Sequence, residues 1–198
     1  MAFCPGPRNP EPETRNPTQY NPPMPDQTLP TSPDILTTTV GSYPVPDWLA
    51  ALPSDQAVID ATRVVIDTQR QAGSDLPTDG ELYRFDVNHP DTNGMIDYFV
   101  KPMGGCRGTL GRSEIEAYRN KQSMAFRAKP AAVVESDLHE GSLDLLSDCQ
   151  RAVNVAGGPL KFTVTSPYML ARTLHATPYG DFEPRVMAVA QAVGDQVR

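Results

Sequence analysis

Residues 73–86 read GSDLPTDGELYRFD and combine a helix stop, a short strand and a cluster of charges. Gly73 is the expected end of the preceding helix, and residues 75–78 are predicted to form a strand that runs directly into the cluster. The cluster, residues 79–86, contains three carboxylates and one guanidinium. Elements that only pack rarely carry such charge, because each buried charge must find a partner or lose its ionisation. A solvated surface turn is the alternative interpretation.

The residues before this stretch complete a strand–helix–strand unit. Residues 35–40, ILTTTV, are rich in β-branched side chains and predict a strand that ends at Gly41-Ser42. Ser54 is a suitable N-cap for a helix over residues 57–72, in which alanine and valine recur at helical spacing. Two strands joined through a helix run parallel, so this part of the chain predicts a βαβ unit.

Downstream of the cluster the pattern is irregular at first. Residues 96–100 form an apolar patch, and Gly104-Gly105 is expected to interrupt the chain. The remaining predicted elements are helices over residues 114–126, 143–156 and 183–197 and strands over residues 131–134 and 160–165. This succession predicts the α/β class.

Three polar motifs follow predicted strands. Gly41-Ser42, residues 79–81 and residues 165–167 each come just after the carboxyl end of one. Parallel α/β folds gather their binding sites at that edge. The coincidence favours a binding site over a solvated turn for the charged cluster.

Composition divides the chain into an extension and one domain. Ten of the 21 prolines precede Asp34, and residues 1–33 have almost no aliphatic side chains, so we expect a disordered, Pro-rich extension there. Residues 34–198 suffice for one domain with a hydrophobic core.

Charge and hydrophobicity exclude several classes of protein. The net charge is −7 with both signs interspersed, which argues against nucleic-acid binding. No apolar run approaches the length of a membrane span, and the start of the chain does not resemble a secretory signal. Cys4, Cys106 and Cys149 form no CxxC pair, so neither a disulfide framework nor a zinc knuckle is predicted. We expect a cytoplasmic protein without a membrane partner, with Cys149 in the core.

The charged cluster allows two kinds of chemistry. Carboxylates beside a guanidinium can hold an amino acid, if a serine hydroxyl or backbone N–H meets its carboxylate. The same carboxylates can instead act as general acid and base, as in a glycosidase, and the sequence does not give the separation that decides. Nucleophilic catalysis is not supported, because the chain has neither G-x-S-x-G nor a cysteine beside a histidine.

The spacing of residues does not indicate a metal or nucleotide site. His89, His139 and His175 belong to no compact ligand pair, so each is interpreted as a surface or capping histidine. Residues 104–108, GGCRG, do not follow a strand as a phosphate loop does.

Three motifs, residues 37–44 (TTTVGSYP), 79–86 (DGELYRFD) and 165–170 (TSPYML), are similar to those of one known family. In this order they resemble the TT-(V/I)-G-S-(F/Y)-P, (H/D)-G-E-x-x-R-x-D and T-(G/S)-P-x-x-(L/M) segments of the catalytic domain of cobalamin-independent methionine synthase. The matches bracket residues 35–174. The first two are fairly specific to this superfamily, which also includes zinc-dependent coenzyme M methyl- and alkyltransferases.

The resemblance implies a (β/α)8 TIM barrel, of which this chain holds the first three to four βα units. It implies a methyltransferase that moves a methyl group to a small thiol such as homocysteine, in methionine synthesis. In the complete enzyme a zinc ion binds the thiol as thiolate, and a methyl-folate is the donor to consider.

The resemblance also assigns roles to residues of the first two motifs. The implied substrate-binding residues are Gly41, Ser42 and Glu81, with Val40 contributing its backbone. The implied supporting residues are Asp79, Arg84 and Asp86. Asp79 stands where better-known members have His, and the catalytic residues stay unassigned.

Three departures from the family pattern matter. The zinc ligands of the family, a His-x-Cys pair followed by a Glu and a distant Cys, have no counterpart here, so we assign no metal ligand and expect the ligands beyond Arg198. Residues 34–198 also fall short of the ~250 residues of a typical barrel. We therefore expect an amino-terminal half-barrel that is inactive alone and either unstable or self-associating. Residues 171–173, ART, stand where folate-using members carry a Trp, which leaves the methyl donor open.

Two alternatives compete with this interpretation. The first is a non-catalytic half-barrel remnant that binds a small amino-acid or thiol ligand. The second is a two-carboxylate hydrolase on a similar barrel, in which Gly41-Ser42 would have no role.

Overall fold

The computed structural model describes residues 35–86, 94–121, 127–176 and 178–197. The extension predicted for residues 1–33 and His89 lie outside these residues. In chain order the helices are α1 (Asp47–Ala51), α2 (Asp55–Gln71), the 3₁₀ helix η1 (Leu82–Arg84), α3 (Asp97–Val100), α4 (Arg112–Lys121), α5 (Leu145–Ala156), α6 (Pro167–Thr173) and α7 (Phe182–Gly194). The strands are β1 (Gly104–Arg107), β2 (Ala132–His139) and β3 (Leu174–Ala176).

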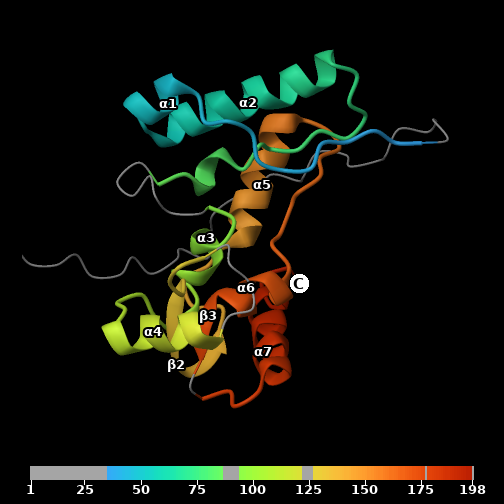
Figure 1. Cartoon of the computed structure of the whole chain (residues 1–198). Coiled ribbons are helices and arrows are strands. Elements are labelled where there is room, and N and C mark those ends of the chain that lie inside the picture. The colour runs from blue at the N-terminus through green and yellow to red at the C-terminus, as the bar shows by residue number, and fades with distance from the viewer. Residues whose placement is uncertain (1–34, 87–93, 122–126, 177, 198) are drawn as a thin grey trace, which may run out of the picture.

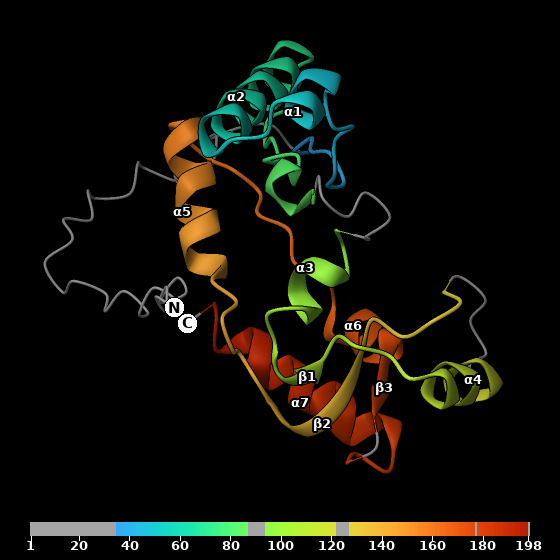
Figure 2. The ribbon, with the colours of Figure 1, turned by 90° about the vertical axis from the view of Figure 1, so that its left-hand side faces the viewer.

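These elements gather at two ends of the molecule (Figures 1 and 2). α1 and α2 lie at one end, and the small sheet lies at the other with α4, α6 and α7. α5 runs between them and packs against α2, where Arg70 donates a hydrogen bond to the Ala156 carbonyl at 2.8 Å. The predicted mixed α/β class is confirmed. No helix that the structure describes is long and apolar enough to cross a membrane.

The helix predicted over residues 57–72 is confirmed as α2. Ser54 caps it, because its hydroxyl accepts a hydrogen bond from the Ala57 N–H at 3.1 Å. Gly73 follows the helix with a φ of +85°, the left-handed conformation that glycine adopts without strain. The apolar face of α2 packs against α1 and η1 in a small core made of Leu49, Ala61, Val65 and Leu82.

The three strands predicted on either side of α2 and near residue 160 meet in single bridges rather than in long ladders. Thr38 pairs with Leu76, and Thr78 pairs with Lys161. Both bridges are parallel. The parallel direction predicted for the two segments on either side of α2 is therefore confirmed, and the third segment is parallel as well. The hydrogen-bonded length of all three is shorter than the sequence suggests.

Side chains explain why the ladders are short. Asp75 Oδ2 accepts the Thr37 N–H at 2.8 Å, and Pro77 has no N–H to offer. Gln69 of α2 reaches Thr78 from the side, accepting its N–H at 2.9 Å and donating to its carbonyl at 2.8 Å. A glutamine side chain thus does at Thr78 what a neighbouring strand would do in a regular sheet.

The interruption predicted at Gly104-Gly105 is wrong, because these glycines begin β1. β1 pairs antiparallel with β2, which extends the strand predicted over residues 131–134, and β2 pairs parallel with β3. The register between β1 and β2 shifts between Gly104 and Cys106. Gly105 has a φ of +81°, and a Cβ on it would collide with the Asp137 carbonyl. The glycines form a bulge within a strand, which composition alone does not distinguish from a break.

Residues 165–167 are also corrected by the structure. The sequence predicts that Ser166-Pro167 ends a strand, but these residues begin α6. The Ser166 hydroxyl accepts the Met169 N–H at 3.3 Å, and Pro167 occupies the first turn, where its missing N–H costs nothing.

The helices predicted over residues 143–156 and 183–197 are confirmed as α5 and α7. α4 begins at Arg112, and residues 122–126 of that prediction lie outside the described residues. The small sheet, α3, α5, α6 and α7 enclose the larger core, whose fully buried members include Phe99, Val134, Leu145, Leu170, Leu174 and Val189.

Candidate functional site

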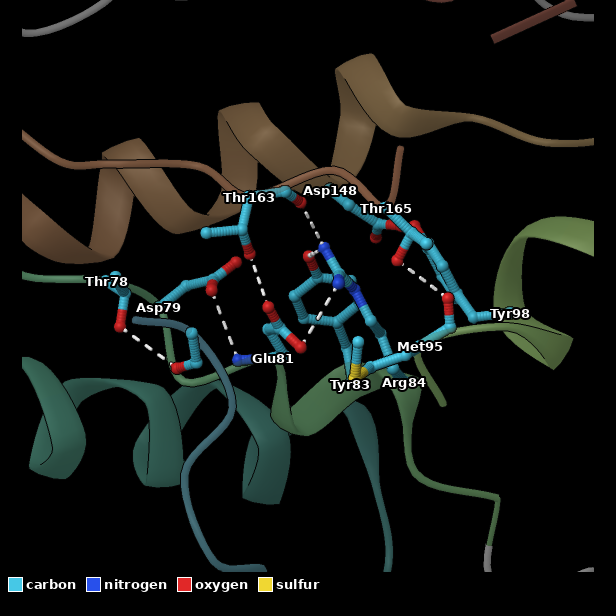
Figure 3. A network of polar contacts seen from close by, with 11 residues as sticks. Thr78, Asp79, Glu81, Tyr83, Arg84, Met95, Tyr98, Asp148, Thr163 and Thr165 are labelled. Carbon is cyan, nitrogen blue, oxygen red and sulfur yellow. Dashed lines mark hydrogen bonds and ion pairs between the residues drawn. The ribbon is translucent and has the colours of Figure 1, made fainter. Parts of the chain in front are cut away.

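The candidate site is built around Glu81, at the residue just before η1. Glu81 has a φ of +58° and is the one non-glycine residue with positive φ among those the structure describes. The side chain of Asp79 supports this conformation, because its Oδ1 accepts the Glu81 N–H at 3.1 Å (Figure 3). Gly80 has a φ of +75°, and a Cβ there would lie 2.8 Å from Val65 Cγ1. The turn therefore accounts for Asp79 and Gly80, whereas Glu81 holds a left-handed conformation that its own side chain does not favour.

Three segments distant in sequence meet at the Glu81 carboxylate (Figure 3). The Thr163 hydroxyl donates to Oε1, and Arg84 Nη1 lies 3.2 Å from Oε2. A Cβ on Gly41 would lie 2.8 Å from Oε1, so the first segment approaches closely only because residue 41 is glycine. The Glu81 side chain is only 9% exposed. Its charge is therefore fixed in place before any ligand arrives.

Arg84 is the buried cation of the site. Its side chain is 3% exposed, and it donates to the Thr163 carbonyl at 2.5 Å and to the Tyr83 hydroxyl at 3.1 Å. The guanidinium carbon also lies 5.1–5.9 Å from the ring centroids of Tyr83, Tyr98, Phe99 and Phe162. Aromatic faces stabilise a cation that has left water, so this arrangement favours the burial of Arg84 and orients it toward Glu81.

The cavity beside this network has a volume of about 260 Å³. Its lining includes Ser42, Tyr43, Glu81, Arg84, Phe85 and Met95. The first loop is attached to the second by a hydrogen bond from the Tyr43 N–H to the Gly80 carbonyl at 2.9 Å. Three of the four predicted substrate-binding residues are thus brought together: Ser42 and Glu81 line the cavity, and Gly41 contacts the Glu81 carboxylate.

Val40 and Asp86 lie away from that cavity. The side chain of Val40 is 93% exposed, which agrees with a backbone role only. Asp86 faces Lys101, with Oδ2 3.5 Å from Nζ, at the edge of a neighbouring cavity. The predicted supporting role of Asp79 and Arg84 thus has direct contacts with Glu81, while Asp86 makes its ion pair elsewhere.

Asp79 and Glu81 do not face one cavity. Asp79 is fully buried and lines a narrow void between α2 and α5, whereas Glu81 lines the cavity of Ser42. Burial raises the pKa of Asp79, while the hydrogen bond from the Glu81 N–H and the charge of Arg84 oppose that rise. Two carboxylates that share no cavity cannot act on one bond, which disfavours the hydrolase alternative.

Thr163 is the site residue that sequence reasoning missed. The polar motif at residues 165–167 drew attention to the end of the third segment, but the contact with Glu81 comes from within it. A usable signal was present, because Lys161, Thr163 and Thr165 alternate with apolar residues and therefore share one face. Each makes a polar contact on that side: Lys161 with the Thr39 carbonyl, Thr163 with Glu81, and Thr165 with the Met95 carbonyl.

The described residues contain no group of three or more His, Cys, Asp or Glu side chains that could hold a metal ion. His139 accepts the Gly141 N–H through Nδ1 at 3.2 Å, as a capping histidine does. Cys149 is half-buried on α5, and Cys106 is half-buried in β1, where burial raises its pKa to about 11. Neither thiol is poised as a metal ligand or nucleophile. The donor set in this part of the chain does not fit the zinc site that the family resemblance implies.

Comparison with known proteins places this chain beside methionine synthases, although no family model matches it. The curated methionine synthase of Saccharolobus solfataricus is 26% identical over 178 residues, which are 84% of this chain and 49% of that protein. The methionine synthases of Pyrococcus horikoshii and Pyrococcus furiosus are 27% and 28% identical over 180 residues, again 84% of this chain and 48% of theirs. The chain therefore spans about half the length of the curated relatives it matches.

A solved structure shares the fold. The B12-independent methionine synthase from Shewanella sp. W3-18-1, solved in complex with selenomethionine, superposes with a TM-score of 0.60 at 18% sequence identity. The superposition covers 81% of this chain and 46% of that chain.

Proposed function

We infer that this chain, which is a partial member of the cobalamin-independent methionine synthase family, forms the amino-acid-binding part of a methyltransferase. The proposed reaction transfers a methyl group to a small thiol, homocysteine, and yields methionine. The proposed ligand of the Glu81 cavity is the amino-acid end of that substrate.

The arrangement of Glu81 is the observation that carries this proposal. Its carboxylate lies at the wall of a cavity of about 260 Å³, held by Thr163 and Arg84 and approached by Gly41. A fixed carboxylate is a suitable partner for the ammonium group of an amino acid. Ser42 on the opposite loop can donate to the substrate carboxylate. The volume suits a small amino acid and lies below the usual range for drug-sized ligands.

The ligand of the structural neighbour supports the same assignment. That protein was solved with selenomethionine, which carries the same ammonium and carboxylate groups as homocysteine and methionine. We propose that Gly41, Ser42 and Glu81 bind those groups here, with Asp79 and Arg84 positioning Glu81. Asp86 is proposed to have a supporting role, in which its ion pair with Lys101 takes part.

We further propose that residues 34–198 are the amino-terminal half of a methionine-synthase-like TIM barrel. The parallel bridges from Thr38 to Leu76 and from Thr78 to Lys161 support this, because they order three extended segments as successive barrel strands. Zinc and a methyl-folate donor are proposed from the family resemblance alone. The described residues do not fit a zinc ion, so we assign no step of thiol activation to them.

Calorimetric titration of the 198-residue chain with homocysteine and with methionine tests the proposal. Both should bind, and Glu81→Gln should weaken binding about tenfold or more, because a charge-assisted hydrogen bond is lost. Glu116→Gln, at an exposed position on α4, is the matched control and should bind as the parent does. Equal affinity in the parent and Glu81→Gln would remove Glu81 from the site.

A glycine pair gives an independent test of the geometry. Gly41→Ala should weaken binding, since its Cβ would displace the Glu81 carboxylate. Gly108→Ala should not, because a Cβ there meets nothing within 4 Å. If both variants bind homocysteine like the parent, Gly41 does not approach the ligand.

One observation favours a non-catalytic binding remnant as the second candidate. Both Glu81 oxygens are engaged by this chain's own Thr163 and Arg84, and no metal group lies among the described residues. Methyl transfer measured with zinc salt, homocysteine and a methyl-folate separates the two. Turnover by the 198-residue chain excludes the remnant, whereas amino-acid binding without turnover supports it.

A further inference from the structure

A second cavity lies between α2 and α5, away from the ligand proposed for Glu81. It has a volume of about 160 Å³ and is lined by Asp55, Val58, Tyr83, Tyr98, Asp148 and Arg151. A narrow extension of about 10 Å³ shares Val58, Tyr83, Asp148 and Arg151 with it and reaches Asp79. The two cavities are therefore neighbours. We call the narrow one, which Asp79 lines, the floor, and the part of the wider one lined by Asp55 and Tyr98 the mouth.

The floor of this cavity carries an unsatisfied acceptor. Asp79 is fully buried, and its Oδ1 accepts the Glu81 N–H. Its Oδ2 makes no hydrogen bond of ordinary geometry, although the Tyr83 hydroxyl lies close enough to lower the pKa of Asp79. A buried carboxylate oxygen without a donor is costly, so a donor delivered by a ligand would be stabilising. The narrow extension has room for about one group the size of water. The site therefore selects a compact hydrogen-bond donor.

The charged side chains in the walls of the cavity favour a positively charged ligand. Asp55 and Asp148 add two carboxylates to Asp79. Against these three stand two guanidiniums: Arg151 lines the cavity and pairs with Asp148 at 2.9 Å, and Arg84 acts on Asp79 from outside the cavity. The Tyr98 hydroxyl donates to the second oxygen of Asp148, so this carboxylate is oriented. Tyr83 and Tyr98 meet edge to face with centroids 5.5 Å apart and offer aromatic surface to a cation.

We propose that the α2–α5 cavity binds the ammonium group of a small primary amine, with Asp79 at the floor and Asp148 at the wall. A primary ammonium is a compact cation that donates hydrogen bonds, and its alkyl part fits the wider outer volume beside Val58. The described residues group no three metal-ligating side chains, so a coordinated metal ion is a poorer occupant. This site is separate from the amino-acid site proposed at Glu81.

The probe is propylammonium chloride, titrated into the isotope-labelled 198-residue chain and followed by NMR. Saturable shifts of α2 and α5 amides are expected. Tetramethylammonium chloride at equal concentration should not produce them, because it has no N–H and is too large for the floor. Identical, non-saturating responses to both salts would overturn the proposal and leave a water molecule as the occupant of the floor.

Variants identify the residues responsible. Asp148→Asn should weaken propylammonium binding about tenfold or more, and the mouth variant Asp55→Asn should weaken it less. The matched control is Asp60→Asn, an exposed position on α2, which should bind as the parent does. Unchanged affinity in both Asp148→Asn and Asp55→Asn would refute the assignment.

The proposals for the two ligand sites can be tested independently of each other. Glu81→Gln should retain propylammonium binding while losing homocysteine binding, and Asp148→Asn should show the reverse. Loss of both ligands in Asp148→Asn alone, with its NMR spectrum otherwise unchanged, would mean that one site binds both and would overturn the second site.

Discussion

The region around α2 and η1 and the region around β2 and α7 are stabilised by different interactions. The first has a small apolar core of Leu49, Ala61, Val65 and Leu82, and its fully buried residues include Thr78 and Asp79. The second has a continuous apolar core from α3 to α7. Hydrogen bonds, an ion pair and close glycine contacts hold the first region together, whereas hydrophobic burial holds the second.

This difference between the two regions explains why the candidate site lies in the first one. A carboxylate such as Glu81 can be held at a cavity wall only where polar partners replace apolar packing, as Thr163 and Arg84 do. We expect the region of the sheet to contribute more to stability, because its apolar core is larger. Phe99 connects the two, since it is fully buried in the larger core and its ring lies 5.1 Å from the Arg84 guanidinium carbon.

The largest loss of stability is expected from a substitution in the larger core. Leu170 is fully buried on α6, and Leu170→Ala should lower the free energy of unfolding by about 3 to 5 kcal/mol, because it leaves a cavity among packed side chains. Urea denaturation followed by circular dichroism measures this. Leu146→Ala, at a position 64% exposed, is the control and should change stability by less than about 0.5 kcal/mol. A small loss at Leu170 would mean that the two regions are not stabilised differently.

The next largest loss of stability is expected at Gly80, and it tests why the site region needs glycine at that position. Gly80→Ala should cost about 2 to 4 kcal/mol, since it combines a φ of +75° with a Cβ placed 2.8 Å from Val65. Gly73→Ala has a similar φ of +85° but meets nothing within 4 Å, so it should cost only about 1 to 2 kcal/mol. Equal losses in the two variants would show that backbone strain alone, and not close packing on Val65, requires glycine at residue 80.

The sequence predicted which residues lie together around the charged turn better than it predicted the sheet. The D-G-E turn was identified because its residues carry chemistry that packing does not need, and the structure does place Ser42 and Glu81 at one cavity. The helices α2, α5 and α7 were predicted because each has an apolar face of its own and recognisable ends. Signals of this kind lie within the element itself, so they do not depend on contacts with distant residues.

The errors have a common physical origin in contacts between distant residues. The sequence predicts an interruption at Gly105 because the partner of this residue in the bulge, Asp137, lies more than thirty residues away. Thr163 escaped notice because only folding brings it to Glu81. The short ladders depend on Gln69, which reaches Thr78 from α2. The contacts of Gly105 and Gln69 leave no local signature in the sequence, and at Thr163 the alternation of polar and apolar residues indicates a shared face but not its partner.

The smallest effect concerns the charge at Asp79. It changes how the free energy of unfolding varies with pH, and the chain stays folded. Burial raises the pKa of Asp79 in the folded chain above that in the unfolded chain, so the folded state binds a proton more tightly. The associated stability is fully present below the unfolded pKa and is lost as pH rises through the folded pKa. Urea denaturation of the parent and Asp79→Asn, between about pH 4 and about pH 8, measures the difference.

Asparagine keeps an acceptor for the Glu81 N–H but cannot ionise, so Asp79→Asn should gain stability relative to the parent as pH rises. The two chains must be compared at each pH, because hydrogen bonds lower the pKa values of Asp75 and Glu114. These two groups make the free energy of unfolding rise with pH in the parent and in Asp79→Asn alike. Asp60→Asn serves as the exposed control. Parallel curves for the parent and Asp79→Asn would mean that the floor carboxylate is already compensated in solution. The polar region would then be no more costly to fold than the apolar one, and the contrast between the two regions would fail at the residue where it should be clearest.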